Sequence, residues 1–325
     1  MATYKEIRGS QIEAVATDPS NPIEGQVWYN TTSNVLKGQS VTSTGAWATG
    51  GALNTVRDQA AGSGTVTSTL VFGGGPPNQD KTESYNGSNW TEMNDLNTAR
   101  RGIAGAGADN TSAVAFGGGS PAKNETETWN GTNWTEVNNL NTSRYFLAGT
   151  GIQTAALAYG GYTTTNVANT ESWNGTNWTN VNSMNSGRAA PISAGVQTSA
   201  LAAGGNDGSV TGKTEQWNGT NWTEVNDLNT VRVGAGGAGV SNTSAIAFGG
   251  SVPYPSAPPP TVPSTVVEEW NGTNWTETTD ISTARAYIAG SGIKTAALAC
   301  GGSDKTNTEV WTGAGSPQTR TFDDS

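Results

Sequence analysis

The chain has 325 residues and a net charge of −10, and it contains no histidine and one cysteine. The acidic balance argues against a nucleic-acid partner, because phosphate backbones are bound by clustered Lys and Arg. The lack of histidine excludes an imidazole base and imidazole metal ligands, so we expect neither a metal nor a cofactor. No apolar stretch is long enough to predict insertion into a membrane.

Residues 1–45 precede a repeated region. Within them we expect a short helix over residues 5–16, a turn-rich break over residues 18–22, and a hairpin over residues 26–37 that turns near residues 32–34. The elements Asp-Pro-Ser-Asn-Pro, Gly-Gln-Val-Trp-Tyr-Asn-Thr-Thr and Leu-Lys-Gly resemble the N-terminal stretch of structural proteins from marine tailed bacteriophages. This resemblance implies that residues 1–45 attach the chain to other virion proteins.

One sequence motif then recurs along the chain, and it is clearest at residues 127–141: Glu-Thr-Trp-Asn-Gly-Thr-Asn-Trp-Thr-Glu-Val-Asn-Asn-Leu-Asn. Its second tryptophan recurs every 44 residues, at positions 90, 134, 178 and 222, and again at 275 after an insertion. An Arg follows each of these tryptophans, and a Gly pair lies about midway between successive Arg residues. A period of about 40 to 50 residues with four short strand signals predicts one blade of a β-propeller.

Six Trp-to-Arg junctions, counting the one from Trp47 to Arg57, predict six blades of four strands each. We expect an innermost strand of Gly, Ala and Ser after each Arg, because only small residues fit where several strands crowd one axis. A second strand should end in the Gly pair. The Trp-Asn-Gly-Thr-Asn-Trp hairpin should supply the third and fourth strands, with its Asn-Gly in a type I′ turn.

The double Gly, the Glu two residues before an aromatic, the second Trp and the closing Arg resemble the kelch repeat over residues 46–312. The resemblance implies an all-β, six-bladed, kelch-like propeller, which we assign to residues 46–325. No second Trp follows Trp311, whereas residues 45–50 carry Trp47 ahead of the first Arg. We therefore expect Trp47 to lie in the fourth, outermost strand of the last blade and so to complete the ring.

One Arg and one Glu recur in all six copies, so a role in a single active site cannot explain them. We interpret them as structural ion pairs or hydrogen-bonded groups. Cys300 occupies a position before a Gly pair that is aromatic or Ala in the other repeats, which indicates a buried packing thiol. The recurring residues are Arg57, Arg100, Arg144, Arg188, Arg232 and Arg285, with Glu83, Glu127, Glu171, Glu215, Glu268 and Glu309.

In such a blade, the loops between the second and third strands lie on the same side as the connections between blades. These loops differ throughout, whereas the Asn-Gly hairpins are nearly identical, and loops on a rigid scaffold commonly carry recognition. The largest departure is a Pro-rich insertion over residues 252–263, expected to be a stiff extended loop. Drift in unconstrained loops is the alternative. The candidate ligand-binding residues are Tyr162, Asn206, Asp207, Lys213, Tyr254 and Asp304.

These patterns favour a non-enzymatic virion structural protein, which is a fibre, tail or capsid appendage on the virion surface that binds a host-surface glycan or protein. A purely structural decoration protein without a ligand is the alternative. A carbohydrate-active enzyme that works with Asp80, Asp207 or Asp304 is a third hypothesis, because some glycosidases use carboxylates alone. A homo-oligomer is compatible with each of them.

Overall fold

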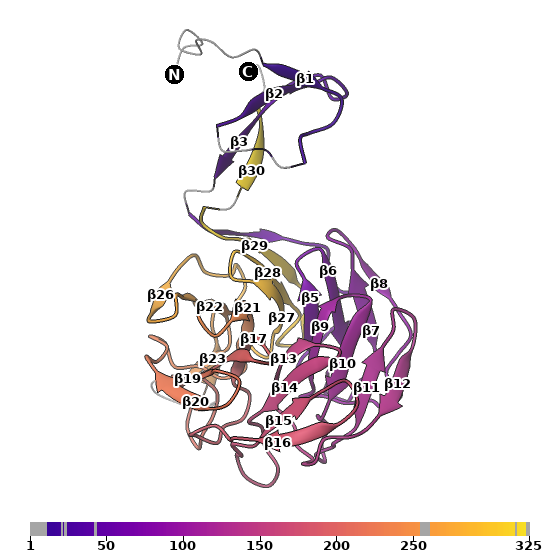
Figure 1. The fold of residues 1–325 in the computed structure, drawn as a ribbon, viewed down its shortest axis with the longest axis vertical. Coiled ribbons are helices and arrows are strands. Elements are labelled where there is room, and N and C mark those ends of the chain that lie inside the picture. The colour runs from indigo at the N-terminus through magenta and orange to yellow at the C-terminus, as the bar shows by residue number, and fades with distance from the viewer. Residues whose placement is uncertain are drawn as a thin grey trace. The chain divides into compact units, whose positions relative to one another are not determined.

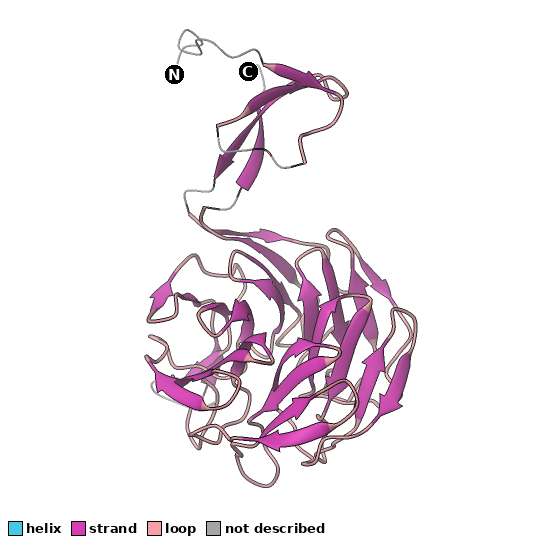
Figure 2. Cartoon of the chain, viewed as in Figure 1, coloured by secondary structure: helices cyan, strands magenta, loops and turns pink. Residues whose placement is uncertain are grey.

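The computed structural model describes residues 12–20, 22, 25–41, 44–253, 261–315 and 317–322. These residues form strands and loops and no helix (Figure 2). They belong to two compact units, the repeat unit, Ala46–Trp311, and the terminal unit, which combines Met1–Gly45 with Thr312–Ser325. The assignment of residues 317–322 to the propeller is wrong, because this segment pairs with residues 36–41 in the terminal unit.

The repeat unit is a six-bladed β-propeller in which every blade is a four-stranded sheet (Figure 1). Blade 1 contains β5 (Ala61–Thr65), β6 (Ser68–Phe72), β7 (Thr82–Tyr85) and β8 (Trp90–Glu92). Blade 2 contains β9 (Ala104–Asp109), β10 (Ser112–Phe116), β11 (Thr126–Trp129) and β12 (Trp134–Val137). Blade 3 contains β13 (Ala148–Ile152), β14 (Ala155–Tyr159), β15 (Thr170–Trp173) and β16 (Trp178–Val181).

The remaining three blades repeat this plan with one insertion and one borrowed strand. Blade 4 contains β17 (Ile192–Val196), β18 (Ser199–Ala203), β19 (Thr214–Trp217) and β20 (Trp222–Val225). Blade 5 contains β21 (Gly236–Ser241), β22 (Ser244–Phe248), β25 (Val267–Trp270) and β26 (Trp275–Glu277), and the short hairpin of β23 (Ser251–Pro253) and β24 (Thr261–Pro263) forms the base of its Pro-rich insertion. Blade 6 contains β27 (Ala289–Ile293), β28 (Ala296–Cys300), β29 (Thr308–Thr312) and β4 (Ala46–Thr49).

The innermost strands lie around a common axis, and each contacts the next in order, β27 and β5 included. Their glycines make this approach sterically feasible. A Cβ atom on Gly149 would lie 2.8 Å from the carbonyl oxygen of Gly105 in the preceding blade, and one on Gly290 would lie 2.4 Å from that of Gly237. Larger side chains would push the blades apart, which explains the small-residue strands that the sequence predicted.

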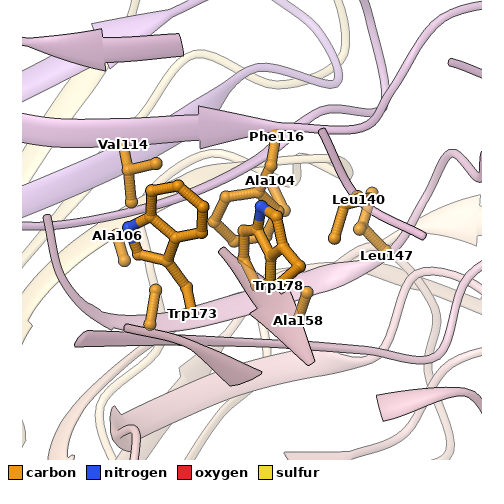
Figure 3. Close-up of a cluster of buried hydrophobic side chains, with 10 residues drawn as sticks. Ala104, Ala106, Val114, Phe116, Leu140, Leu147, Ala158, Trp173 and Trp178 are labelled. Atoms are coloured by element: carbon orange, nitrogen blue, oxygen red, sulfur yellow. The ribbon is translucent and has the colours of Figure 1, made fainter. Parts of the chain in front are cut away.

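Adjacent blades pack through their aromatic residues, as Figure 3 shows for blades 2 and 3. Trp173 and Trp178 of blade 3 lie against Val114 and Phe116 of blade 2, and the rings of Phe116 and Trp178 meet edge to face with centroids 4.8 Å apart. The indole N–H of Trp178 also donates to the hydroxyl of Thr126 on the third strand of blade 2, at 3.0 Å. Equivalent buried clusters occupy the other contacts between blades, including the one between blades 6 and 1.

Strand β4 places Trp47 at the outer edge of blade 6, where the other blades have their second Trp. Its ring packs 5.2 Å from Trp311 and 5.3 Å from Phe248 of blade 5, measured between centroids. Blade 5 has Val267 where the other blades have the Thr that accepts from this indole. The Nε1 of Trp47 donates instead to the carbonyl oxygen of Thr279, at 3.1 Å. The indole keeps a hydrogen bond although the repeat has lost its usual acceptor.

The hairpins are four-residue loops, so the prediction of type I′ turns is wrong. In blade 2, Trp129 pairs with Trp134 and leaves residues 130–133 as the loop. Gly131 has a φ of 90°, but Asn130 has no positive φ. The side-chain oxygen of Asn130 accepts the backbone N–H groups of residues 132 and 133, at 3.0 and 2.9 Å. Asn therefore acts here as a side-chain acceptor, and Gly alone supplies the left-handed backbone.

The terminal unit is a four-stranded sheet in the order β1 (Glu13–Val15), β2 (Val27–Asn30), β3 (Val35–Val41) and β30 (Pro317–Phe322). The hairpin expected over residues 26–37 is confirmed, with its turn at residues 31–34. The helix expected over residues 5–16 is wrong for residues 13–15, which pair in parallel with β2, and residues 5–11 lie outside the described residues.

Asp18 connects the three sequence elements of the terminal unit. Its Oδ1 accepts the indole N–H of Trp28 at 3.0 Å and the amide of Asn30 at 2.7 Å, and its Oδ2 pairs with the ammonium of Lys37 at 2.7 Å. Lys37 and these hydrogen bonds lower the pKa of Asp18 to about 2. The short elements quoted from the N-terminal sequence are thus parts of one hydrogen-bonded structure around Trp28, which is fully buried.

Candidate functional site

The recurring Arg and Glu residues form six ion pairs within the blades, with Nη to Oε1 distances of 2.7 to 3.1 Å. In blade 3, Arg144 also donates to the carbonyl oxygens of Gly160 and Asn169. Glu171 in turn accepts the backbone N–H groups of residues 141 and 142. All twelve side chains are buried, so they join each incoming connection to its blade and lie out of reach of a ligand.

Cys300 is a free thiol buried between blades 6 and 1, as expected for a packing residue. Burial raises the pKa of this thiol far above its usual range, which keeps it protonated and unreactive. Among the described residues no group of three acidic or Cys side chains is placed to hold a metal ion. No helix of sufficient length and hydrophobicity to span a membrane occurs among them either.

The propeller has two unlike faces. The connection face carries the links between blades together with the loops between second and third strands, because these segments pair with one another, as in the bridges of Tyr145 with Tyr162 and of Ala189 with Asn206. The hairpin face carries the Asn-Gly loops and the turns between first and second strands. The expected position of the variable loops, on the side of the connections, is confirmed by these bridges.

Each hairpin loop of blades 2 to 5 is bonded to an Asn that follows the fourth strand of the preceding blade. Asn138 of blade 2 donates to the carbonyl oxygen of Thr176 and to the side chain of Asn177 in the next hairpin, at 3.0 and 2.8 Å. The same pair of bonds starts from Asn94, Asn182 and Asn226 in three other blades. Structural hydrogen bonding therefore accounts for the uniformity of these loops.

The predicted loop residues of blade 4 bond mainly within their own loop. Asp207 pairs with Lys213 at 2.8 Å, and Lys213 also reaches the hydroxyl of Ser186 at 3.2 Å. The side chain of Asn206 accepts the backbone N–H of Gly208 at 2.9 Å. The hydrogen bond from Lys213 is the main cause of the lowered pKa of Asp207. These three residues thus hold the shape of the loop, whatever else they contact.

The other predicted residues lie in different blades. Tyr162 of blade 3 packs edge to face on Tyr145, with centroids 5.5 Å apart. Asp304 of blade 6 is exposed and adopts a φ of 54°. Burial raises the pKa of the nearby Asp58 to about 6, and the negative charge of Asp304 adds to this rise. Tyr254 falls outside the described residues.

Around the axis, on the connection face, the chain forms a closed ring of backbone hydrogen bonds that sequence reasoning missed. Each ring residue donates its N–H to the carbonyl oxygen of the ring residue in the preceding blade, at 2.5 to 3.3 Å. All six have left-handed backbones, with φ between 49° and 64°. We call this set the mouth ring, and it consists of Gln59, Gly102, Phe146, Ala190, Gly234 and Tyr287.

The mouth ring surrounds a cavity of about 120 Å³ on the axis, lined by the ring residues and by the start of each innermost strand. Phe146 and Tyr287 come from opposite blades, and their ring centroids lie 5.5 Å apart. The Phe146 ring lies over Gly102, and the Tyr287 ring lies over Gly234, since Cβ atoms on these glycines would be 3.0 and 2.8 Å from the aromatic carbons. Small neighbours therefore make room for two large side chains at the cavity entrance.

The mouth ring had one sequence signal. Its members stand two residues after each recurring Arg and, unlike the Arg and the Gly pair, vary from blade to blade, with Gly in two of the six blades. Their common left-handed backbone could not be foreseen, because the hydrogen bonds that impose it run between blades.

No protein-family model and no curated protein matches the sequence. Among solved structures, the structure of YjhT has a TM-score of 0.67 and 12% sequence identity, over 83% of this chain and 99% of that chain. At this identity the similarity concerns the fold alone. It supports the propeller architecture of the repeat unit.

Proposed function

We propose that the chain is a non-enzymatic structural protein of a tailed-bacteriophage particle, exposed on the virion surface as a fibre, tail or capsid appendage. Its repeat unit is in this proposal a kelch-like propeller that recognises a glycan or protein on the host cell. The terminal unit serves to attach it to other virion proteins. The kelch assignment is supported by the Gly pairs, the paired Trp residues and the buried Arg–Glu pairs of every blade.

The observation that carries the recognition role is the contrast between the two propeller faces. Every hairpin loop has the same four-residue form, and its polar residues bond within the loop and to the Asn that follows the fourth strand of the preceding blade. The connection face combines loops of different length and sequence with a central cavity entrance that holds two aromatic rings. A scaffold with one uniform and one diversified face is typical of proteins that bind through the diversified one.

Attachment through the terminal unit is supported by its separate sheet and its own buried residue, Trp28. Because Asp18 ties the three N-terminal elements together, the motif behind the virion resemblance corresponds to a folded structure. A compact unit with its own hydrogen-bond network can bind a partner without altering the propeller.

Two measurements test the proposal. Mass spectrometry of purified particles should detect the chain, and particles made with Asp18→Ala should carry less of it, since this change removes the acceptor for Trp28, Asn30 and Lys37. The purified protein should compete with particle adsorption to host cells. An absence of the chain from particles would refute the virion assignment. Presence without competition would favour a decoration protein that has no ligand.

A further inference from the structure

We propose that the cavity entrance at the mouth ring is a binding subsite for one uncharged sugar ring, with Phe146 and Tyr287 as its stacking surface. This inference rests on the recognition role proposed above and names the ligand class and the residues. It shifts the site from the loop residues predicted from sequence to the axis of the propeller.

The strongest support is the backbone of the two aromatic residues. Phe146 has a φ of 53° and Tyr287 a φ of 54°, in the left-handed region that bulky residues rarely occupy. The equivalent residues of blades 2 and 5 are Gly102 and Gly234, which adopt this conformation without strain. The fold therefore accepts Gly at this position, and a large aromatic side chain there is unfavourable for the backbone. Strained residues of this kind cluster at functional sites.

The geometry of the entrance fits a small flat ligand. The two aromatic rings are half-buried and converge from opposite blades on a cavity of about 120 Å³. Pockets that enclose an entire small molecule measure roughly 300 to 1,000 Å³, so this one would accept a single ring of a longer chain. The apolar C–H face of a sugar packs on aromatic rings, which offer contact area at low conformational cost.

Polar groups at the entrance favour hydroxyl donors. Gln59 lines the same cavity, and its Oε1 accepts no hydrogen bond from any described residue. Asp58 lies near Tyr287, as shown by its influence on the pKa of that phenol, which burial chiefly raises. Asp304 adds a second carboxyl group beside Asp58. These carboxyl groups and the net charge of −10 would repel sialylated or otherwise acidic sugars.

The test compares three variants on the full chain. Phe146→Gly and Tyr287→Gly remove the aromatic rings and also the backbone strain. Ala190→Gly is the matched control, because Ala190 occupies the same ring position with a φ of 49° but presents no aromatic group. Binding is first measured on an array of neutral and sialylated oligosaccharides. The strongest neutral ligand is then titrated by calorimetry, and melting temperatures are recorded in parallel.

We expect neutral glycans to bind and both aromatic variants to weaken that binding about tenfold or more. Ala190→Gly, which removes only one methyl group from the cavity lining, should weaken it far less. The melting temperatures should stay within a few degrees of the parent, because relief of strain offsets the lost packing. A fourth variant, Gly102→Ala, leaves both aromatic residues in place but puts a Cβ atom 3.0 Å from the Phe146 ring. It should displace the ring and weaken binding too, which keeps the test decisive if an aromatic variant fails to fold.

Binding of no glycan, binding of sialylated glycans alone, or equal affinity in the aromatic variants and the parent would overturn the proposal. Competition with particle adsorption separates this failure from failure of the proposed function. If the parent protein and the aromatic variants compete equally well, recognition stands and the mouth ring is excluded as its site. If the parent protein does not compete, host recognition fails, and a glycan affinity that depends on Phe146 would still establish the subsite.

Discussion

Replacing Glu171 by Gln should test whether the buried ion pairs hold the propeller together. The change keeps the shape of the side chain but removes its charge. In the structure, Oε1 accepts from Arg144 at 3.1 Å and from the backbone N–H of Thr142 at 3.3 Å, while Oε2 accepts the backbone N–H of Asn141 at 2.7 Å. The amide N–H of a glutamine would face one of these N–H donors without an acceptor between them. The change would also leave the Arg144 guanidinium without a negatively charged partner.

The expected loss follows from the burial of the pair. Both side chains are 0% exposed, and burial already lowers the pKa of Arg144 to about 10 against the attraction of Glu171. Removing one partner of a buried pair destabilises proteins by about 3 to 5 kcal/mol. At roughly 2 to 4 °C per kcal/mol for a large domain, the melting temperature should fall by about 6 to 20 °C.

Unfolding in urea, followed by tryptophan fluorescence, would measure the change in free energy. Glu224→Gln is the matched control, because this Glu is exposed on β20 and its replacement should change stability by less than about 0.5 kcal/mol. The double variant Arg144→Met with Glu171→Gln should lose less than the sum of the single variants, since no buried charge is left alone. A loss below about 1 kcal/mol for Glu171→Gln would refute the role that we assign to the pair.

Three further predictions concern other parts of the chain. Trp47→Ala removes ring contacts with Trp311 and Phe248 and should lower the unfolding free energy by about 2 to 4 kcal/mol, measured in urea; an unchanged midpoint would mean that β4 contributes little to the ring. Asp58→Asn should flatten the pH dependence of the melting temperature. Because the pKa of Asp58 is raised to about 6, its contribution to stability is complete below about pH 4 and is lost as the pH rises through 6. After allowance for solvent screening, Asp58→Asn should recover about 1 to 2 kcal/mol of unfolding free energy at pH 8. Equal pH profiles for the variant and the parent would contradict this. Asn130→Ala removes the acceptor for two backbone N–H groups of one hairpin and should destabilise the fold by about 1 kcal/mol while leaving ligand affinity unchanged, and a loss of affinity in folded protein would move the binding site to the hairpin face.

The features that could be predicted from the sequence are those that repeat. The 44-residue spacing predicted the blades, and a missing Trp at the end of the last repeat indicated that Trp47 belongs to its fourth strand. The pairing of Arg with Glu followed from their common recurrence. In each case several copies of the repeat share the same residue at the same position, so that the pattern does not arise by chance and indicates a structural requirement.

Single-copy features were harder to predict. Strand β30 has no counterpart in the repeats, and its place beside β3 depends on a pairing between residues at opposite ends of the sequence, such as Lys37 with Thr321. The loop type of the hairpins was misjudged because Asn-Gly fits both a two-residue turn and a loop in which Asn130 acts as acceptor. Only the register of Trp129 with Trp134 distinguishes these two loops.

Departures from a repeat differ in what they say about function. Val267 departs from the Thr of the other blades, but Trp47 finds the carbonyl oxygen of Thr279 instead, so packing alone explains this position. Phe146 and Tyr287 depart from Gly at positions where the backbone favours Gly, and no hydrogen bond of the mouth ring needs their side chains. A departure that the structure absorbs without strain is compatible with drift. Phe146 and Tyr287 persist against the backbone preference of their fold, and we propose contact with a ligand at the entrance of the axial cavity as the role of their side chains.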